Sequence, residues 1–400
     1  MAELKALIEE TSTDKYHIEY RGPLSNHMAH GLIALYRLGA TEPRLREFAR
    51  WYAQRLEPAR TSQEPTGSTS EDCRAALNAE TLTQLLGKRQ QYAAIKAHYT
   101  HHLAEAYDGR VAALLQAELP VMADGMHCAA LHPIIHAGYG VSVDSAALVI
   151  EGVAYLHYAY EPTGALAARQ PGVAADLDLA TALQTLRDSG VADDIRRLRA
   201  DESFRPDLSN VFLRNMAAVM SLPHHRERVP ELVSRLAFAD WFDAAAAAAG
   251  HVTMPDVLRL VEETVLHWCV TLYARAECRN DFFLLHGVTS CWALLQVLRH
   301  FSDADVAFTC VQYFVASLLY VYMTQGCPHV DMTPLVGTTS TDCSSLEGVR
   351  AEVLAQTLDE HVYKLVHVCV ELSRSHPENM PLYELACRNA IDHDFRYHFL

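Results

Sequence analysis

The chain of 400 residues is half hydrophobic and one-fifth charged, the balance of a protein that folds into a packed core. It carries 33 lysines and arginines against 49 aspartates and glutamates, a formal net charge of −16. Such an acidic chain lacks the basic surface of a general nucleic-acid-binding protein, so we expect no nucleic-acid partner. Histidine is frequent, with 22 residues, and lysine is rare, comprising only Lys5, Lys15, Lys88, Lys96 and Lys364.

Apolar residues recur at helical spacing along almost the whole chain. The best strand candidate, residues 17–21, is short, and convincing hairpins are missing from the pattern. We therefore predict an all-α fold: one large multi-helix domain over residues 1–400, with a central set of buried helices and loop insertions. The helices are expected over residues 26–38, 42–56, most of 82–122, 133–137, 144–160, 176–187, 210–220, 231–249, 255–275, 282–301, 305–323, 347–373 and 382–394.

Segments rich in Pro, Gly, Ser and Thr separate these helices. They predict an exposed loop at 58–73, a linker at 162–172 and a polar loop at 326–345. Residues 306–323 are uncharged and just long enough to cross a bilayer. Because this stretch contains Thr309, Gln312 and Ser317 and has no flanking basic cluster, we expect a buried central helix rather than a membrane span.

The cysteine pattern and the N-terminus favour the cytoplasm. No two of the ten cysteines form a CxxC pair, and several sit in apolar helical stretches, as buried free thiols do. The N-terminal stretch carries early acidic residues and no long apolar run, so it does not resemble a signal peptide. These features predict free thiols in a reducing compartment.

The common cofactor and nucleophile motifs are missing from the sequence. There is no GxGxxG after a strand, no GxxxxGK[ST], no GxSxG and no HExxH. A redox cofactor would therefore be a metal, or be bound in a fold without the usual fingerprint.

Two histidine pairs lie at helical spacing. His27 and His30 are three residues apart and share one helix face, although alone they could be surface residues near a helix start. His132 and His136, four residues apart in LHPIIHAGYG, could offer two imidazoles to one metal, or form a hydrogen-bonded core pair. We expect the following Gly138 and Gly140 to end this helical turn.

Two single residues stand out on apolar helices. His286 is the only imidazole in the apolar run that follows Asp281, although a lone core histidine is usually structural. Lys364 lies among valines and leucines, flanked by His361 and His367. A buried lysine can lose its proton and act as a base, a nucleophile or a carbamate ligand, whereas a lysine that reaches the surface has no such role.

The remaining histidines suggest no site. We expect His98, His101 and His102 to be solvated on a partly polar helix, and His224 and His225 to lie in a proline-bounded loop.

Four blocks, NHMAHGLIALYRLGA, HPIIHAGYG, DFFLLHGVTS and HVYKL, occur in the order seen in questin oxidase-like proteins. The chain resembles that family from Asn26 to Lys364. The family is similar to fungal enzymes that open anthraquinone-type rings with molecular oxygen, formally by Baeyer–Villiger oxidation or oxidative cleavage. The resemblance implies an oxygenase without a flavin fingerprint, acting on a small apolar aromatic substrate.

The resemblance also implies a mononuclear non-haem iron(II) site of histidines and a modified lysine, for which zinc or another transition metal is the competitor. The same blocks carry the candidate ligands, ranked His30, His132, His286 and Lys364, then His136 and His27. Six protein ligands would leave no open position, so at least one must act from outside the metal's ligand set. His136 and His27 could instead move protons. Tyr139 could bind a substrate carbonyl, or simply pack in the core.

Three alternatives remain at this level. The chain could use NADPH or a flavin without the usual fingerprint, bind an apolar ligand without a metal, or act as a zinc hydrolase. Each alternative predicts a different property of the purified protein. A flavin enzyme would be yellow, a ligand-binding protein would contain no metal, and a zinc hydrolase would bind zinc tightly.

Overall fold

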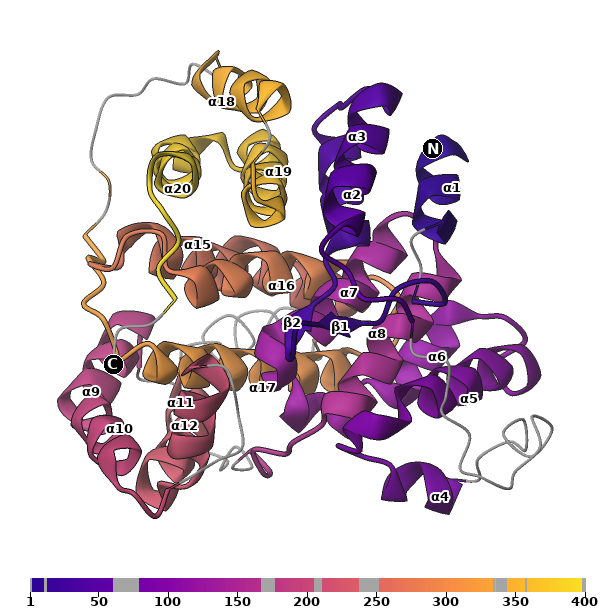
Figure 1. Ribbon diagram of the computed structural model, residues 1–400. Coiled ribbons are helices and arrows are strands. Elements are labelled where there is room, and N and C mark those ends of the chain that lie inside the picture. The colour runs from indigo at the N-terminus through magenta and orange to yellow at the C-terminus, as the bar shows by residue number, and fades with distance from the viewer. Residues whose placement is uncertain are drawn as a thin grey trace.

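The computed structural model describes residues 2–10, 13–59, 79–166, 177–204, 211–236, 252–333, 335, 344–356 and 358–397. The first part of the chain forms α1 (Ala2–Glu10), β1 (Glu19–Tyr20), β2 (Leu24–Ser25), α2 (Met28–Arg37), α3 (Glu42–Ala53), α4 (Ala79–Gln84), η2 (Arg89–Gln91), α5 (Tyr92–Glu105), α6 (Val111–Glu118), η3 (Pro120–Gly125), η4 (Cys128–Leu131), α7 (His132–Ser142) and α8 (Ala146–Ala159). The second part forms α9 (Leu179–Asp188), α10 (Val191–Ala200), α11 (Val211–Met220), α12 (Pro223–Arg235), α14 (Met254–Leu260), the π-helical turn η5 (Val261–Val265), α15 (Leu266–Arg275), α16 (Phe282–Leu298), α17 (Ala304–Thr324), α18 (Ser344–Ala355), α19 (Glu360–Ser375), η6 (Pro377–Asn379) and α20 (Met380–Asp392) (Figure 1).

The all-α prediction is confirmed. Among the described residues the only sheet is the antiparallel pair of β1 and β2, in which Tyr20 is opposite Leu24. This pair overlaps the weak strand candidate at 17–21. Figure 1 shows α9 to α12 gathered beside α17, and α18 to α20 grouped together near α15.

Helix α7 is packed between α8 and α16 at the centre of the protein. The expectation that Gly138 and Gly140 end a helical turn is wrong, because α7 continues to Ser142. A Cβ atom on Gly138 would lie 2.3 Å from the carbonyl oxygen of Ala293 in α16. The glycine is therefore needed for close approach of two helices.

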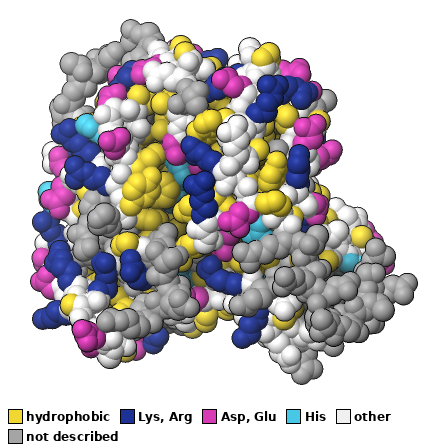
Figure 2. Space-filling view, in the orientation of Figure 1, with side chains coloured by type: hydrophobic (Ala, Val, Ile, Leu, Met, Phe, Trp, Pro, Cys, Tyr) yellow, Lys and Arg dark blue, Asp and Glu magenta, His cyan; other side chains and the backbone are white. Residues whose placement is uncertain are grey.

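Helix α17 is the buried central helix that the apolar run predicted. Its length and composition would suit a membrane span, but 72% of its apolar window is buried inside the protein. Core helices of globular proteins pass the same length and hydropathy test, so the burial favours that interpretation. Figure 2 shows basic and acidic side chains interspersed on one face of the molecule, with apolar side chains between them.

Two expectations about histidines are wrong. His98 is 8% exposed, because its face of α5 packs towards the core. His224 and His225 lie in the first turn of α12 rather than in a loop, and His225 is fully buried, with Nε2 2.7 Å from Asp194.

The expected loops fall largely outside the described residues. This applies to 60–73, 167–172, 334 and 336–343, together with 237–249 of the helix expected at 231–249. Residues 58–59, 162–166, 326–333 and 335 contain no helix, whereas α18 begins at Ser344, inside the predicted polar loop. The eight described cysteines are free and buried, as predicted; Cys73 and Cys343 lie outside the described part.

Candidate metal centre

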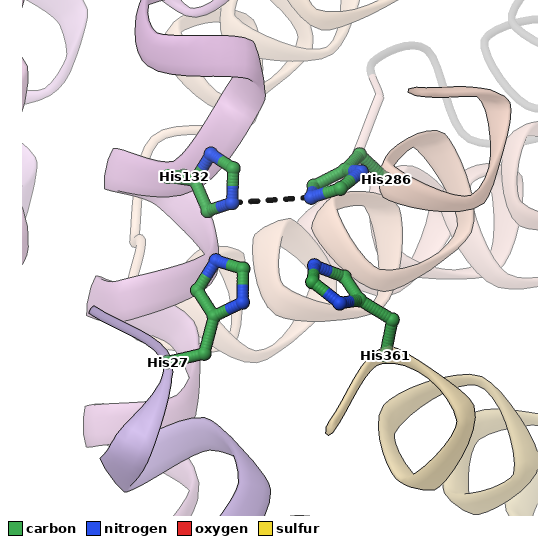
Figure 3. Close-up of side chains that lie close together, drawn as sticks. All are labelled: His27, His132, His286 and His361. Atoms are coloured by element: carbon green, nitrogen blue, oxygen red, sulfur yellow. Dashed lines mark hydrogen bonds between the residues drawn. The ribbon is translucent and has the colours of Figure 1, made fainter. Parts of the chain in front are cut away.

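Four histidines from distant parts of the chain meet at the starts of four helices (Figure 3). His27 immediately precedes α2, His132 opens α7, His286 lies in the second turn of α16 and His361 lies in the first turn of α19. One ligand atom from each side chain lies within 4.8 Å of those of the others. All four side chains are buried and point towards one another.

The outer nitrogen of each ring is already bonded. His132 Nδ1 contacts the carbonyl oxygen of Ala129, and His286 Nδ1 lies 2.6 Å from the carbonyl oxygen of Phe282. A carbonyl only accepts, so in both rings Nδ1 carries the proton and Nε2 carries the lone pair. This fixes which nitrogen each ring presents to the centre of the cluster.

Carboxyl groups contact the Nδ1 atoms of the other two histidines. His361 Nδ1 lies 2.6 Å from Asp359, and His27 Nδ1 lies 3.2 Å from Glu360. Burial raises the pKa of Asp359, but His361 and Lys364 outweigh it and hold the pKa at about 2, so this carboxylate is ionised and accepts. Burial and the neighbouring Asp359 raise the pKa of Glu360 to about 7, so the contact with Glu360 does not fix the position of the proton on His27. The Nε2 atoms of His27 and His361 have no hydrogen-bond partner.

The two remaining Nε2 atoms, of His132 and His286, face each other at 3.1 Å. With both Nδ1 atoms protonated, two lone pairs oppose each other unless one ring takes a second proton. Burial lowers the pKa of both rings well below the ordinary value, which disfavours that extra proton. A cation bound between the Nε2 atoms would accept both lone pairs and remove their repulsion. Neutral imidazole is a common ligand of transition metals.

The backbone before His132 is held in an unusual conformation. Ala129, Ala130 and Leu131 have φ values of 46°, 54° and 68°, in the left-handed region that residues with a Cβ rarely adopt. Each such residue costs about 1–3 kcal/mol unless the surroundings enforce it. The turn brings the Ala129 carbonyl onto His132, so the strain coincides with the fixing of one candidate ligand.

The N-terminal ends of four helices lie at the cluster, together with the carboxyl groups of Asp359 and Glu360. The N-terminus of a helix carries partial positive charge from its unpaired N–H groups, and four of them converge here. Burial lowers the pKa of all four rings, which favours the neutral imidazole that a metal requires, although Asp359 opposes this effect at His361.

Lys364 supplies an amine beside this cluster. It lies three residues after His361 on α19, is fully buried, and its Nζ has no hydrogen-bond partner. Burial lowers the pKa of the amine to about 8, so its neutral form is accessible near neutrality. The Lys364 charge also lowers the pKa of His27, which places the amine within electrostatic range of the cluster.

His30 and His136 belong to a neighbouring network instead. His30 Nε2 lies 2.9 Å from His136 Nδ1, and His136 Nε2 lies 3.0 Å from the buried carboxylate of Glu151. His30 is adjacent to the four-histidine cluster, with its ring centroid 5.5 Å from that of His27. The structure thus groups His27, His132, His286 and Lys364 of the candidate ligands, and pairs His30 with His136.

Tyr139 lies beside His30 and is not one of the ring neighbours that the structure records for the four clustered histidines. Its ring centroid is 5.3 Å from His30 and 4.9 Å from Trp292, and its buried hydroxyl has no hydrogen-bond partner. Burial raises its pKa, so the phenol stays protonated.

The sequence interpretation did not include His361 among the candidate ligands, nor the carboxyl groups of Asp359, Glu360 and Glu151 that contact the histidine rings. His361 was noticed only as a neighbour of Lys364, yet its spacing of three residues places both on one face of α19. Glu151 gave a usable signal, since it is the only carboxylate in the apolar stretch Ala146–Ala159. Asp359 and Glu360 gave none, because acidic residues at a helix start are common caps.

Sequence comparison identifies the family of the chain. Residues 24–369 match the family model described as questin oxidase-like, and this range contains the four histidines, Lys364 and Glu151. No curated protein matches the chain. The family description implies an oxidoreductase of the oxidase or oxygenase type, and the buried histidine cluster is compatible with metal binding. On the match over most of its length, the chain belongs to the questin oxidase-like family.

Proposed function

We propose that this protein is a metal-dependent oxygenase that uses iron(II) to oxidise an apolar, anthraquinone-like aromatic substrate by ring cleavage or Baeyer–Villiger-type insertion. The observation that carries the proposal is the convergence of four neutral imidazoles whose outer nitrogens are all bonded, within a family named for an oxidase. His27, His132, His286 and His361 would hold the metal. Iron(II) would supply the one-electron chemistry by which molecular oxygen reacts with a closed-shell organic molecule.

Lys364 would provide the anionic ligand that four neutral imidazoles lack. Its neutral amine can attack carbon dioxide, forming an N–C bond and releasing a proton, to give a carbamate oxygen donor. The buried, unpartnered amine and its lowered pKa support this modification. The carbamate would replace the carboxylate that mononuclear iron sites commonly use.

An aromatic wall suits an apolar substrate. The ring of Phe282 lies 4.5 Å from that of His361 and 4.7 Å from those of His286 and Tyr397. Phe395 stacks edgewise on the same ring, at 5.4 Å. Tyr397 is half exposed, so these rings extend from the cluster to the surface. They would exclude water from the centre and offer faces on which a planar ring can stack.

A cavity in the described part of the chain lies elsewhere. It has a volume of about 550 Å³ and is formed by α9 together with Tyr322 and residues 329–333. None of the four clustered histidines lines it. We therefore place the substrate at the aromatic wall, beside the four histidines that would hold the metal, rather than in this cavity.

Metal analysis of protein purified without a chelator tests the proposal directly. We expect close to one iron per chain, or uptake of one iron(II) on anaerobic reconstitution. The replacement His361→Gln should abolish that stoichiometry, whereas His367→Gln should not, because His367 is buried on the same helix but bonds to Glu371. Protein that neither contains nor takes up a transition metal would exclude this function.

Activity is tested by oxygen uptake with 1,8-dihydroxyanthraquinone, in the presence and absence of NADPH. Oxygen uptake with product formation supports the oxygenase, and its dependence on NADPH identifies the electron donor. Four imidazoles also suit zinc. Tight zinc binding without oxygen uptake would instead indicate the hydrolase alternative.

A further inference from the structure

The four clustered histidines are shielded from solvent. His27, His132, His286 and His361 are each at most 6% exposed. A planar aromatic substrate reaches rings this deeply buried only when a covering element moves aside, and such a lid also keeps water away from a reacting centre. The element that covers the cluster therefore belongs to its function.

Aromatic rings cover the cluster in two layers. The ring of Phe282 forms the inner layer and lies 4.5 Å from that of His361. The outer layer is the strap, residues 393–397, which follows α20. In the strap the rings of Phe395 and Tyr397 lie 5.4 Å and 4.7 Å from that of Phe282, and the Phe395 ring lies 5.9 Å from that of His361. The strap thus lies between the inner layer and solvent, where Tyr397 is half exposed.

Three hydrogen bonds tie the strap to the start of α16 in the described structure. The amide N–H of Arg396 donates to the carbonyl oxygen of Asn280 at 3.0 Å, and the amide N–H of Phe282 donates to the carbonyl oxygen of Arg396 at 2.9 Å. The carbonyl oxygen of His393 accepts the third bond, from the side-chain amide of Asn280. Four of the five strap residues are exposed, the exception being Phe395. Segments held by a few bonds near the surface open locally at a fraction of the free energy of global unfolding.

Asn280 anchors the strap. It is fully buried, and its φ of 54° is in the left-handed region, which Asn tolerates better than most residues. Its Oδ1 atom accepts from the hydroxyl of Tyr273 in α15 at 2.7 Å, which directs the Nδ2 amide towards the carbonyl oxygen of His393. One buried residue thus makes two of the three bonds to the strap, one through its side chain and one through its carbonyl oxygen.

We propose that the strap is a lid over the metal centre and that Asn280 is the latch that keeps it closed. Release of the three hydrogen bonds would lift Phe395 and Tyr397 from Phe282, so that an incoming planar substrate meets the inner aromatic ring. The inference deepens the proposed function by naming the route to the same site, and it rests on that function only where bound metal is measured.

A second approach to the cluster, beside Arg55, is less suitable. The Arg55 side chain is 35% exposed and lies 3.7 Å from Glu360, whose carboxyl group contacts His27. Its guanidinium also stacks on Trp51, 3.8 Å from the ring centroid. An apolar ring that enters there would separate a buried carboxyl group from its guanidinium partner, which is costly. At the strap the same ring meets aromatic faces.

The first experiment measures amide hydrogen exchange in the metal-free protein by NMR. In wild type we expect the amides of Phe282 and Arg396 to exchange together, about 100-fold or more faster than those in the middle of α16, because they open with the strap. Asn280→Gly, in which glycine keeps the positive φ, should speed the exchange of both amides at least about tenfold. Asn215→Ala should leave it unchanged and is the matched control, because buried Asn215 also donates to a backbone carbonyl, that of Thr324 at 2.8 Å.

The second experiment measures the release of cobalt(II) from loaded protein to excess dipicolinate, followed by the loss of the cobalt absorption. Asn280→Gly and Phe395→Ala should speed release at least about tenfold. A lid changes uptake and release alike, so Kd should change much less than the release rate. Arg396→Ala should release cobalt at the wild-type rate, because this side chain is exposed and its backbone bonds remain. Phe395→Ala still tests the lid if loss of the Asn280 side chain prevents folding.

The outcomes separate the lid from the proposed function. Exchange of the Phe282 and Arg396 amides as slow as that in the middle of α16 would overturn the lid, whether or not the protein binds metal. Faster exchange with unchanged cobalt release in Asn280→Gly would overturn the strap as the route and favour the side of Arg55. A loss of affinity as large as the gain in release rate would show that the variants distort the ligands instead. If wild-type protein binds no metal, the proposed function fails, and exchange alone decides whether the strap opens over the histidines.

Discussion

His132 and His286 present unprotonated Nε2 atoms to each other at 3.1 Å, because a backbone carbonyl accepts the Nδ1 proton of each ring. A hydrogen bond between two such nitrogens is impossible without an extra proton, which burial disfavours. The cluster is therefore compatible with a bound cation. This relationship supports a metal centre more directly than the number of histidines does.

Metal binding should stabilise the fold measurably. A cation that binds only the folded state adds about 2.7 kcal/mol when its free concentration is about 100 times Kd. We expect Tm to rise by several degrees on loading with iron(II) or cobalt(II) and to fall again with a chelator, as measured by anaerobic differential scanning fluorimetry. In His286→Gln the metal should have little effect. An equal metal-induced shift in that variant would argue that the cation binds elsewhere.

Replacing Lys364 by methionine should separate stability from metal binding. The amine is buried without a partner, so Lys364→Met should increase the free energy of unfolding of the metal-free protein by about 1–3 kcal/mol. The same change should weaken metal binding by at least tenfold. Denaturant unfolding and calorimetric metal titration measure the two effects.

Lys96→Met is the matched control for Lys364→Met. The Lys96 ammonium is paired with Asp14 and Glu151, so its loss leaves a buried carboxylate without its cation and should destabilise the protein. A loss of stability in Lys364→Met would show that the amine is paired.

Carbamylation of Lys364 should be visible in the metal-loaded protein. With ¹³C-bicarbonate we expect one carbamate signal in the carbon NMR spectrum of a zinc-loaded sample, and none in Lys364→Arg, because arginine does not give up its proton. Full metal affinity together with normal oxygen uptake in Lys364→Arg would remove the carbamate from the site.

Gly138→Ala tests the contact between α7 and α16. The added Cβ would lie 2.3 Å from the Ala293 carbonyl oxygen, so one helix must shift, at a cost of about 1–3 kcal/mol. Since α7 carries His132 and α16 carries His286, metal affinity should fall as well. Gly348→Ala is the control: its Cβ meets nothing within 4 Å on α18, and it should stabilise by about 0.5–1 kcal/mol. Similar unfolding free energies for the two variants would contradict the tight packing.

Stability should fall in mild acid because of His127. Burial lowers the pKa of this histidine from 6.5 to about 4. Between these values the unfolded chain binds a proton that the folded protein does not, so this group alone costs up to about 3 kcal/mol as the pH falls from about 6.5 to about 4. His127→Gln should therefore show a shallower decline of unfolding free energy over this range than wild type. If the unfolding free energies of wild type and His127→Gln fall in parallel over this pH range, His127 is protonated in the folded protein.

The sequence was sufficient for the helical class and for part of the site. Helical spacing of apolar residues gives the all-α fold, since each helix must bury one face. Titratable residues inside apolar segments, such as His132, His286 and Lys364, indicated a buried site. Burying a polar group costs free energy unless the group is paired or bound to a ligand. The resemblance of the motif blocks indicated the family.

Only the tertiary structure decided which nitrogen of each histidine faces the centre and which side chains meet there. The sequence interpretation ranked His30 above His27 as a ligand and did not propose His361. Local spacing shows which residues share a helix face, but the meeting of four helix ends depends on packing between distant segments. The Ala129 carbonyl, Asp359 and Glu151 act through contacts of this kind, so their part in the site follows from the packed structure alone.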